Sequence, residues 1–188
     1  MFPKAGEWSG KRILVLGMAK SGIAVAKLLH RLGAKVTVND KKPREETPEA
    51  AQLEELGVRV ILGGHPDSLL SEDIDLIVKN PGIPYHIPFI QKAIYAHIPI
   101  VTEIEVAGRL TDSPLIGISG SNGKTTTTSL VGEMLVAGGL KARVAGNIGT
   151  ALTEAIQEAD SKEWLVTELS SFQLKGIDQF HPQVAALL

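Results

Sequence analysis

The stretch Ile118-Ser119-Gly120-Ser121-Asn122-Gly123-Lys124-Thr125-Thr126 lies between a predicted strand (115–119) and a predicted helix (125–137). Its glycines let the backbone wrap closely around an anion, so that several N–H groups point at one phosphate. The positive end of the following helix dipole adds to this attraction. In such a loop Lys124 reaches the β- and γ-phosphates of a nucleotide and the Thr125 hydroxyl binds Mg²⁺. We therefore predict an ATP-binding loop formed by Gly120, Ser121, Asn122, Gly123, Lys124, Thr125 and Thr126.

The loop departs from the common phosphate-loop pattern G-x-x-x-x-G-K-[ST], which requires glycine where Ile118 stands. Gly120 is the usable glycine, and it makes the loop two residues shorter. The alternative is an ordinary glycine-containing turn that carries a surface lysine. Gly-Lys-Thr-Thr at a strand–helix junction favours the phosphate loop.

Short apolar runs alternate with helix-length segments on both sides of this loop. The predicted strands are 12–16, 35–38, 58–62, 75–78, 98–101, 115–119, 142–145, 164–167 and 184–188. The predicted helices are 23–32, 125–137, 148–158 and 170–180. Strands that are apolar throughout, rather than alternating, are typical of parallel sheets covered on both faces. The pattern predicts an α/β chain: a Rossmann-like parallel-sheet domain (1–102), then a P-loop-type ATPase domain (103–188) that opens with a linking helix (103–110).

The last residues, 184–188, form an apolar run with no turn or cap after it. We expect the second domain to be incomplete in this chain, which belongs to a longer protein. By itself the chain is then expected to be inactive.

The composition excludes several classes of protein. The 188 residues are 44% hydrophobic and 21% charged, with a net charge of −2 and no cysteine. A nucleic-acid partner normally requires a clearly basic surface, and thiolate metal sites and disulfides require cysteine. The longest uncharged stretch, 80–91, contains three prolines, so no membrane span is expected. Residues 1–12 lack the apolar stretch of a signal peptide, so none is expected there. We expect a cytoplasmic globular protein whose five histidines have surface or core roles.

A carboxylate that assists the phosphate loop is expected at the end of a neighbouring strand. Glu168 follows the run 164–167 and meets the same edge of a parallel sheet, where it can hold Mg²⁺. A merely solvated carboxylate is the alternative. Asn147 also follows a strand, and it either reaches the same crevice or caps the next helix.

A second glycine-containing loop, 17–22, follows the first predicted strand. It resembles the dinucleotide fingerprint G-x-G-x-x-G with Ala19 in place of the middle glycine, and it favours a nucleotide diphosphate more than NAD. Asp40 ends the second strand, where such folds contact the ribose or base. Gly82, in Asn80-Pro81-Gly82, provides a second backbone approach to the diphosphate or simply a turn.

Taken together, these motifs resemble those of the Mur ligases of peptidoglycan synthesis. The shortened loop 120–126 is similar to that of the family. The segments Glu168-Leu169-Ser170-Ser171-Phe172-Gln173-Leu174 and Asn80-Pro81-Gly82-Ile83-Pro84 are similar to those of the members that add D-glutamate. The resemblance covers the whole chain. It implies a monomeric ATP-dependent ligase, with UDP-N-acetylmuramoyl-L-alanine, ATP and D-glutamate as substrates and Mg²⁺ as cofactor.

The resemblance also implies roles for individual residues. Lys124 and Glu168 would be catalytic, and Thr125 and Glu168 would hold Mg²⁺. Residues that would contact the UDP-precursor are Ala19, Lys20, Ser21, Asp40, Lys41, Gly82, Asn147, Ser170 and Gln173. Two alternatives stay open: a nicotinamide-dependent oxidoreductase that uses the first loop, and a non-catalytic nucleotide-binding module.

Overall fold

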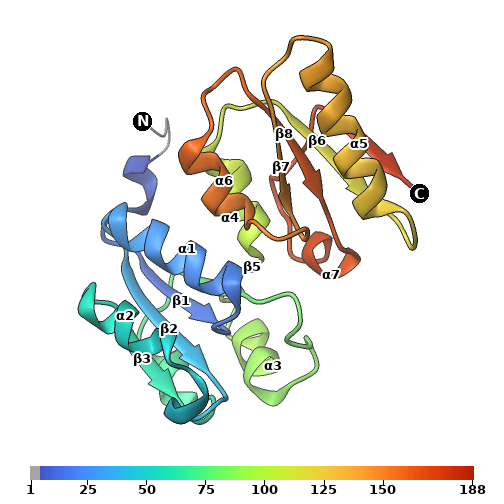
Figure 1. Cartoon of the computed structure of the whole chain (residues 1–188). Helices are drawn as coiled ribbons and strands as arrows, with labels where there is room; N and C mark the ends of the chain where they lie inside the picture. The colour runs from blue at the N-terminus through green and yellow to red at the C-terminus, as the bar shows by residue number, and fades with distance from the viewer. Residues whose placement is uncertain (1–4) are drawn as a thin grey trace. The chain divides into compact units, whose positions relative to one another are not determined.

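A computed structural model of the chain describes residues 5–188, which divide into two compact units, Ala5–Glu103 and Ile104–Leu188. Each unit is built on one parallel sheet with helices on its faces (Figure 1). The predicted α/β class with parallel sheets is therefore confirmed. No helix among residues 5–188 is both long enough and apolar enough to cross a membrane.

The first unit has a five-stranded sheet in the order β3-β2-β1-β4-β5. Its strands are β1 (Arg12–Leu16), β2 (Lys35–Asp40), β3 (Arg59–Leu62), β4 (Leu76–Lys79) and β5 (Ile100–Val101). Its helices are η1 (Ala5–Trp8), α1 (Lys20–Arg31), η2 (Arg44–Glu46), α2 (Glu49–Glu55), η3 (Asp67–Ser71) and α3 (Pro88–Tyr95). The chain leaves β1 toward β2 and later returns to pair β4 on the other side of β1. This reversal creates a crevice at the carboxyl ends of the strands, where α/β proteins bind ligands.

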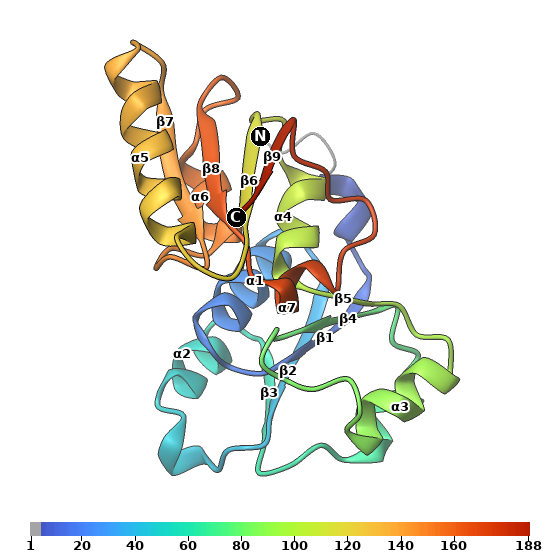
Figure 2. The same ribbon diagram turned by 90° about the vertical axis from the view of Figure 1, so that its right-hand side faces the viewer.

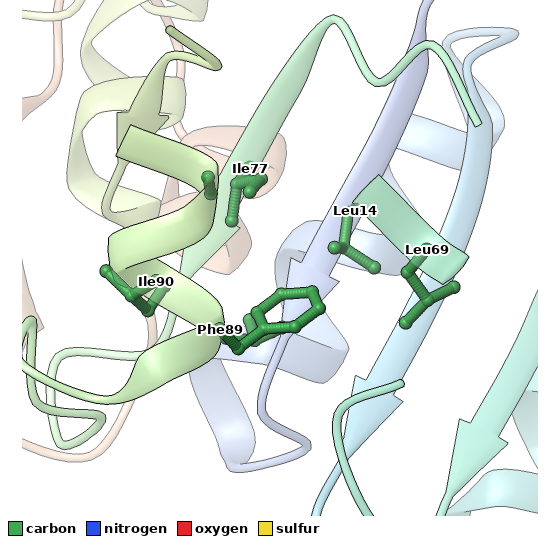
Figure 3. Close-up of a cluster of buried hydrophobic side chains, with 7 residues drawn as sticks. Leu14, Leu69, Ile77, Phe89 and Ile90 are labelled. Carbon is green, nitrogen blue, oxygen red and sulfur yellow. The ribbon is translucent and has the colours of Figure 1, made fainter. Parts of the chain in front are cut away.

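Apolar periodicity explains how the helices of the first unit pack. Val25, Leu28 and Leu29 of α1 are fully or almost fully buried, and α1 lies along β1 and β2. Helix α3 lies on the other side of the sheet (Figure 2), and a cluster of buried side chains packs beneath α3 and η3 (Figure 3). Its members are Leu14, Leu16, Leu69, Ile77, Phe89, Ile90 and Ala93. Burial of each large side chain contributes about 1.5–3 kcal/mol, so this core stabilises the sheet of the first unit.

The second unit has a four-stranded parallel sheet in the order β7-β8-β6-β9. Its strands are β6 (Leu115–Ser119), β7 (Ala142–Gly146), β8 (Trp164–Glu168) and β9 (Val184–Leu187). Its helices are α4 (Glu103–Leu110), α5 (Lys124–Ala137), α6 (Leu152–Glu158) and α7 (Ser171–Leu174). Figure 1 shows α5 on one side of this sheet and α4 and α6 on the other. Ile116, Ile118 and Val166 form the buried core beneath α5.

All nine predicted strands form, with bounds within two residues of those expected. The helix predicted over 148–158 begins later, at Leu152. The reason is a turn in which the Gly146 N–H donates to the Thr150 carbonyl at 2.8 Å, while Gly149 takes a φ of +118°. That left-handed conformation is accessible to glycine and stops the helix from extending backward. Asn147 therefore does not cap a helix, and that interpretation was wrong.

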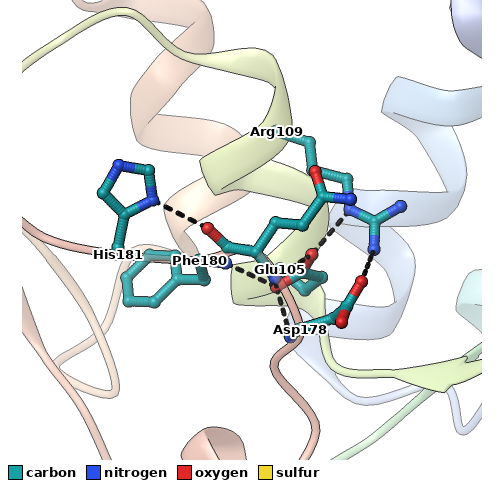
Figure 4. A network of polar contacts seen from close by, with 6 residues as sticks. Glu105, Arg109, Asp178, Phe180 and His181 are labelled. Carbon is teal, nitrogen blue, oxygen red and sulfur yellow. Dashed lines mark hydrogen bonds and ion pairs between the residues drawn. The ribbon is translucent and has the colours of Figure 1, made fainter.

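The helix predicted over 170–180 is also shorter, because α7 ends at Leu174. The backbone N–H groups of Asp178, Gln179 and Phe180 all donate to the carboxylate of Glu105, at 2.9–3.1 Å (Figure 4). Donors that are committed to a side chain do not form the i to i−4 bonds of a helix. A residue distant in sequence thus decides the conformation of this segment.

Candidate nucleotide sites

A cavity of about 470 Å³ opens at the carboxyl ends of the strands of the first unit. The loop after β1 contributes Gly17, Met18 and Ala19 to its wall, and the end of β2 contributes Asp40 and Lys41. The remaining lining residues are Lys42, Glu46, Thr47, Glu49, His65, Asn80, Gly82, Ile83, Pro84 and Ile87. The cavity therefore combines a helix N-terminus, two lysines, three carboxylates and an apolar wall. The helix N-terminus favours an anion, and the apolar wall suits a flat ring.

The loop after β1 folds tightly against α1. A side chain at Gly22 is impossible there, because its Cβ would lie 2.0 Å from the Gly17 carbonyl oxygen. Ala19 is the N-cap residue of α1 and lines the cavity. Lys20 and Ser21, which were predicted to contact the same ligand, begin the helix and do not line the cavity. Close helix–strand packing of this kind is the role of the third glycine in dinucleotide-binding turns.

Asp40 ties the loop after β1 to the end of β2. Its Oδ2 accepts a hydrogen bond of 2.6 Å from the Met18 N–H, and its Oδ1 accepts one of 2.9 Å from the Lys42 N–H. Asp40 and Lys41 both line the cavity, and their contact with a nucleotide remains a prediction. The carboxylate therefore shapes the cavity wall in addition to facing it.

Gly82 lies at the cavity and also closes a turn. Its N–H donates to Asn80 Oδ1 at 3.0 Å, and Asn80 Nδ2 donates to Ser21 Oγ at 3.4 Å. This N–H is thus engaged within the turn, while the glycine leaves room at the wall. The segment 80–82 links the end of β4 to the start of α1.

Lys79 positions the same segment, and the sequence analysis missed it. Its side chain is 1% exposed, and its Nζ donates to the carbonyl oxygens of Asn80 at 3.0 Å and Ile83 at 2.7 Å. The ammonium also lies 4.6 Å from the centre of the Tyr85 ring, within cation–π range. A buried lysine was unexpected, because a lysine at a strand end is normally exposed to solvent.

In the second unit, the loop 120–123 joins β6 to α5. Gly123 is the N-cap residue of α5 and has a φ of +78°, a conformation that favours glycine. Lys124 Nζ donates to the carbonyl oxygens of Gly120 at 2.7 Å and Ser121 at 3.3 Å. The ammonium is therefore held over the loop, at the helix N-terminus where an anion is favoured.

Glu168 is the centre of a polar cluster beside this loop. Its Oε2 accepts a hydrogen bond of 2.6 Å from the Thr125 hydroxyl, and its Oε1 accepts one of 2.9 Å from Asn147 Nδ2. Glu168 is 2% exposed, and within residues 5–188 no cationic side chain lies within 4.0 Å of it. A buried carboxylate with only neutral donors has an uncompensated charge, which a cation would neutralise.

The cluster fits Mg²⁺. This ion prefers oxygen ligands and usually takes one or two carboxylates, with waters and nucleotide phosphates completing its shell. Glu168 and Thr125 provide a carboxylate and a hydroxyl next to the predicted phosphate site. No group of three or more histidine and acidic residues capable of binding a metal occurs in the described part of the chain, so the phosphates and waters would supply the other ligands.

Ser170 and Gln173 cap the short helix α7. Gln173 Oε1 accepts from the Ser170 N–H at 2.9 Å, and the Gln173 N–H donates to Ser170 Oγ at 3.2 Å. Gln173 is almost fully buried. These contacts form a capping box, which accounts for the pattern Ser-x-x-Gln without a ligand. A role of Ser170 and Gln173 in ligand binding remains a prediction.

The fold and these two sites define a class: an α/β protein with two phosphate-type loops, each at the carboxyl edge of a parallel sheet. Comparison with family models is more specific. Residues 11–102 match the Mur ligase MurD-like N-terminal domain, and residues 118–188 match the Mur ligase middle domain. The chain belongs to the Mur ligase family.

Its curated relatives have the same description. The chain is 59% identical over 178 residues to a UDP-N-acetylmuramoylalanine--D-glutamate ligase of Geobacillus sp. (strain WCH70), an alignment of 95% of the chain and 40% of that protein. It is 53% identical to the ligase of that name from Enterococcus faecalis, covering 98% of the chain and 41% of the relative. The chain thus spans about 40% of the length of these relatives.

Solved structures support the fold. A ligase from Neisseria meningitides, described as acting on UDP-N-acetylmuramate and L-alanyl-gamma-D-glutamyl-meso-diaminopimelate, matches 95% of the chain and 60% of its own, with a TM-score of 0.59. A murein peptide ligase from Psychrobacter arcticus matches 95% of the chain and 43% of its own, with a TM-score of 0.56. Both are 20% identical to the chain, so they establish the architecture alone.

Proposed function

We propose that this chain provides the UDP-precursor site and the ATP site of a ligase that adds D-glutamate to UDP-N-acetylmuramoyl-L-alanine. The observation that carries the proposal is the buried carboxylate of Glu168 beside the loop 120–124, where it accepts hydrogen bonds from the exposed residues Thr125 and Asn147. The description of the relatives supports the choice of substrates. ATP and UDP-sugars are made and used in the cytoplasm, so we propose that the protein acts there. We also propose that it acts as a monomer.

The chemistry explains why two nucleotide sites are needed. A carboxylate does not acylate an amine at neutral pH, because oxide is a very poor leaving group. Transfer of the γ-phosphoryl group from ATP forms a bond between phosphorus and the alanyl carboxylate oxygen and releases ADP. The amine of D-glutamate then attacks the acyl phosphate, forms the amide bond, and releases phosphate and a proton.

The second unit would assist the phosphoryl transfer. Catalysis of this step consists largely of positioning and charge neutralisation. In our proposal Lys124 and the N–H groups of residues 120–126 bind the ATP phosphates, and Thr125 and Glu168 hold Mg²⁺. When bound, Mg²⁺ would neutralise charge on the transferred group.

The first unit would hold the precursor by its UDP part. We assign this role to Ala19, Asp40, Lys41 and Gly82, which line the cavity, and to Lys20 and Ser21, which follow Ala19 in the first turn of α1. Asn147, Ser170 and Gln173 of the second unit are proposed to contact the muramoyl part. Because Asn147 is paired with Glu168 and the other two pair with each other, they would use their remaining hydrogen-bonding capacity.

A chimera tests the proposal directly. Residues 1–188 replace the aligned part of the Geobacillus relative, and the product formed from ATP, UDP-N-acetylmuramoyl-L-alanine and D-glutamate is measured by mass spectrometry. We expect the UDP-muramoyl-dipeptide and an equal amount of ADP. A folded chimera that binds both nucleotides but forms no product would contradict the proposal.

The same chimera carrying Lys124→Ala tests the phosphate loop. We expect turnover to fall by about 10²–10³-fold, because a charge that stabilises the transition state is lost. Precursor binding should be unchanged. Lys175→Ala, an exposed lysine of the same unit, is the control. Near-normal turnover of the Lys124→Ala chimera would show that the loop is only structural.

A further inference from the structure

His65 occupies a defined place in the wall of the first cavity. It follows β3, lines the cavity, and is half-buried. Its ring packs against Phe89, with the ring centres 5.6 Å apart. Phe89 itself is 4% exposed and belongs to the core cluster beneath the sheet (Figure 3). The imidazole is thus held against a rigid support.

The amide of Asn39 has one possible orientation. Its Nδ2 donates to the carbonyl oxygens of Ile61 at 2.9 Å and Gly64 at 2.7 Å. Carbonyl oxygens only accept hydrogen bonds, so the NH₂ group must face them. Asn39 Oδ1 then faces His65 Nδ1 at 2.6 Å, and Asn39 is fully buried.

This arrangement fixes the tautomer of His65. An amide oxygen only accepts, so Nδ1 must carry the proton that it donates to Asn39. Burial lowers the pKa of His65; Asp40 opposes this effect and Lys41 adds to it. The neutral ring is therefore favoured at neutral pH. Nε2 is then a hydrogen-bond acceptor, and within residues 5–188 nothing pairs with it.

We propose that His65 Nε2, held as an acceptor by Asn39, accepts a hydrogen bond from the N3–H of the uracil ring. The inference rests on the proposed function, which places a uridine diphosphate in this cavity. It adds a specificity-determining residue that motif and spacing did not predict.

The acceptor would distinguish pyrimidines by chemistry. Uracil has a proton on N3, whereas N3 of cytosine is an acceptor with a lone pair. A lone pair facing Nε2 makes no hydrogen bond and leaves a desolvated acceptor on each side, which is more costly than the loss of one bond. The apolar wall of Ile83, Pro84 and Ile87 would provide a surface for the ring.

Calorimetry on the 188-residue chain tests the proposal with three ligands. UDP, 3-methyl-UDP and CDP share their diphosphate, and only UDP has a proton on N3. We expect the other two to bind roughly tenfold more weakly or worse. Because only the ligand changes, folding of a variant is not a concern. Equal affinity for UDP and 3-methyl-UDP would overturn the inference and leave the proposed function standing. Absence of any UDP binding would overturn both.

The variant His65→Phe completes the comparison. It keeps an aromatic ring against Phe89 but has no acceptor, so UDP and 3-methyl-UDP should bind within about twofold of each other. His181→Phe, an exposed histidine of the second unit, should keep the full preference for UDP. A His65→Phe chain that still prefers UDP would overturn the inference.

The tautomer can be observed without any ligand. In ¹⁵N NMR spectra of the histidine rings at pH 7, we expect a protonated Nδ1 and an unprotonated Nε2 for His65. The Nε2 resonance should move in the direction of hydrogen-bond acceptance when UDP is added. An imidazolium, or a protonated Nε2, in the free chain would contradict the proposal.

Discussion

At the scale of single residues, two buried glutamates show how surroundings decide a role. Glu105 is fully buried and receives hydrogen bonds from Arg109 and from three backbone N–H groups (Figure 4). Its charge is compensated within the protein. Glu168 is equally inaccessible but has only the neutral donors of Thr125 and Asn147. The first carboxylate therefore has a structural role, and the second is suited to a bound cation.

Glu168→Gln tests the cation site. Calorimetry of ATP binding to the 188-residue chain is compared with and without Mg²⁺. In the unchanged chain Mg²⁺ should strengthen binding, and in the variant we expect this gain to fall by roughly tenfold because a carboxylate ligand is lost. Glu158→Gln, an exposed carboxylate of the same unit, should keep the whole gain. Undiminished Mg²⁺ dependence in Glu168→Gln would refute the assignment.

Glu105→Gln tests the structural role. We expect it to lower the free energy of unfolding of the second unit by about 3 kcal/mol at pH 7. Arg109 loses the charge of its buried partner, and the NH₂ group of the new glutamine faces backbone N–H donors. Denaturation followed by Trp164 fluorescence, in a Trp8→Phe background, measures the loss. Asp178→Asn is the control: its carboxylate is exposed, and an exposed pair contributes about 0–1 kcal/mol.

The pH dependence of this difference has a definite sign. Burial alone raises the pKa of Glu105, but the hydrogen bonds from Arg109 and the backbone of residues 178–180 outweigh it, and the pKa lies below its ordinary value of 4.5. A carboxylate with a lowered pKa stabilises the fold above its unfolded pKa and loses this contribution as the pH falls. The gap between native and Glu105→Gln chains should therefore shrink below about pH 4.5. A constant gap from pH 7 to pH 3 would contradict this account.

At the scale of elements, local patterns predicted the strands well and two helices poorly. The run 12–16 and the glycine-containing loop before α5 are determined by nearby residues: β-branched apolar side chains and glycines at a turn. The end of α7 is determined by Glu105, which lies about seventy residues earlier. No periodicity within residues 170–180 contains that information.

The candidate sites show the same limit. The loops 17–22 and 120–126 were predicted from their glycine patterns, and Asp40 and Glu168 were predicted from their places at strand ends of a parallel sheet. Lys79 and His65 were not, because their importance depends on burial and on partners such as Asn39. A single histidine after a strand has no spacing to identify it.

Strand β9 is the element for which we predict the least protection. All four residues are exposed, and β9 pairs only with β6 at the edge of its sheet. Amide hydrogen exchange should be faster in β9 than in β1, whose interior residues are fully buried between two strands. Mass-spectrometric exchange on peptides covering residues 12–16 and 184–188 measures this. Equal protection of both strands would contradict the prediction.

At the scale of the whole molecule, each unit has its own phosphate-type loop at the carboxyl edge of its own sheet. The two loops differ in chemistry. The first borders a cavity with a helix N-terminus and an apolar wall, which suit a nucleotide attached to a larger precursor. The second has a lysine and a buried carboxylate, which suit a nucleotide triphosphate with Mg²⁺. The ligase proposal accounts for both, whereas an oxidoreductase would use only the first.

The most direct test is an NMR titration of the ¹⁵N-labelled 188-residue chain with UDP-N-acetylmuramoyl-L-alanine, with ATP and Mg²⁺, and with NADH. We predict that the precursor shifts the amide resonances of residues 17–19, 40–42 and 82. ATP with Mg²⁺ should shift those of residues 120–126 and 168, and NADH should shift neither group. Shifts of residues 17–19 with NADH, and none with the precursor, would contradict the account.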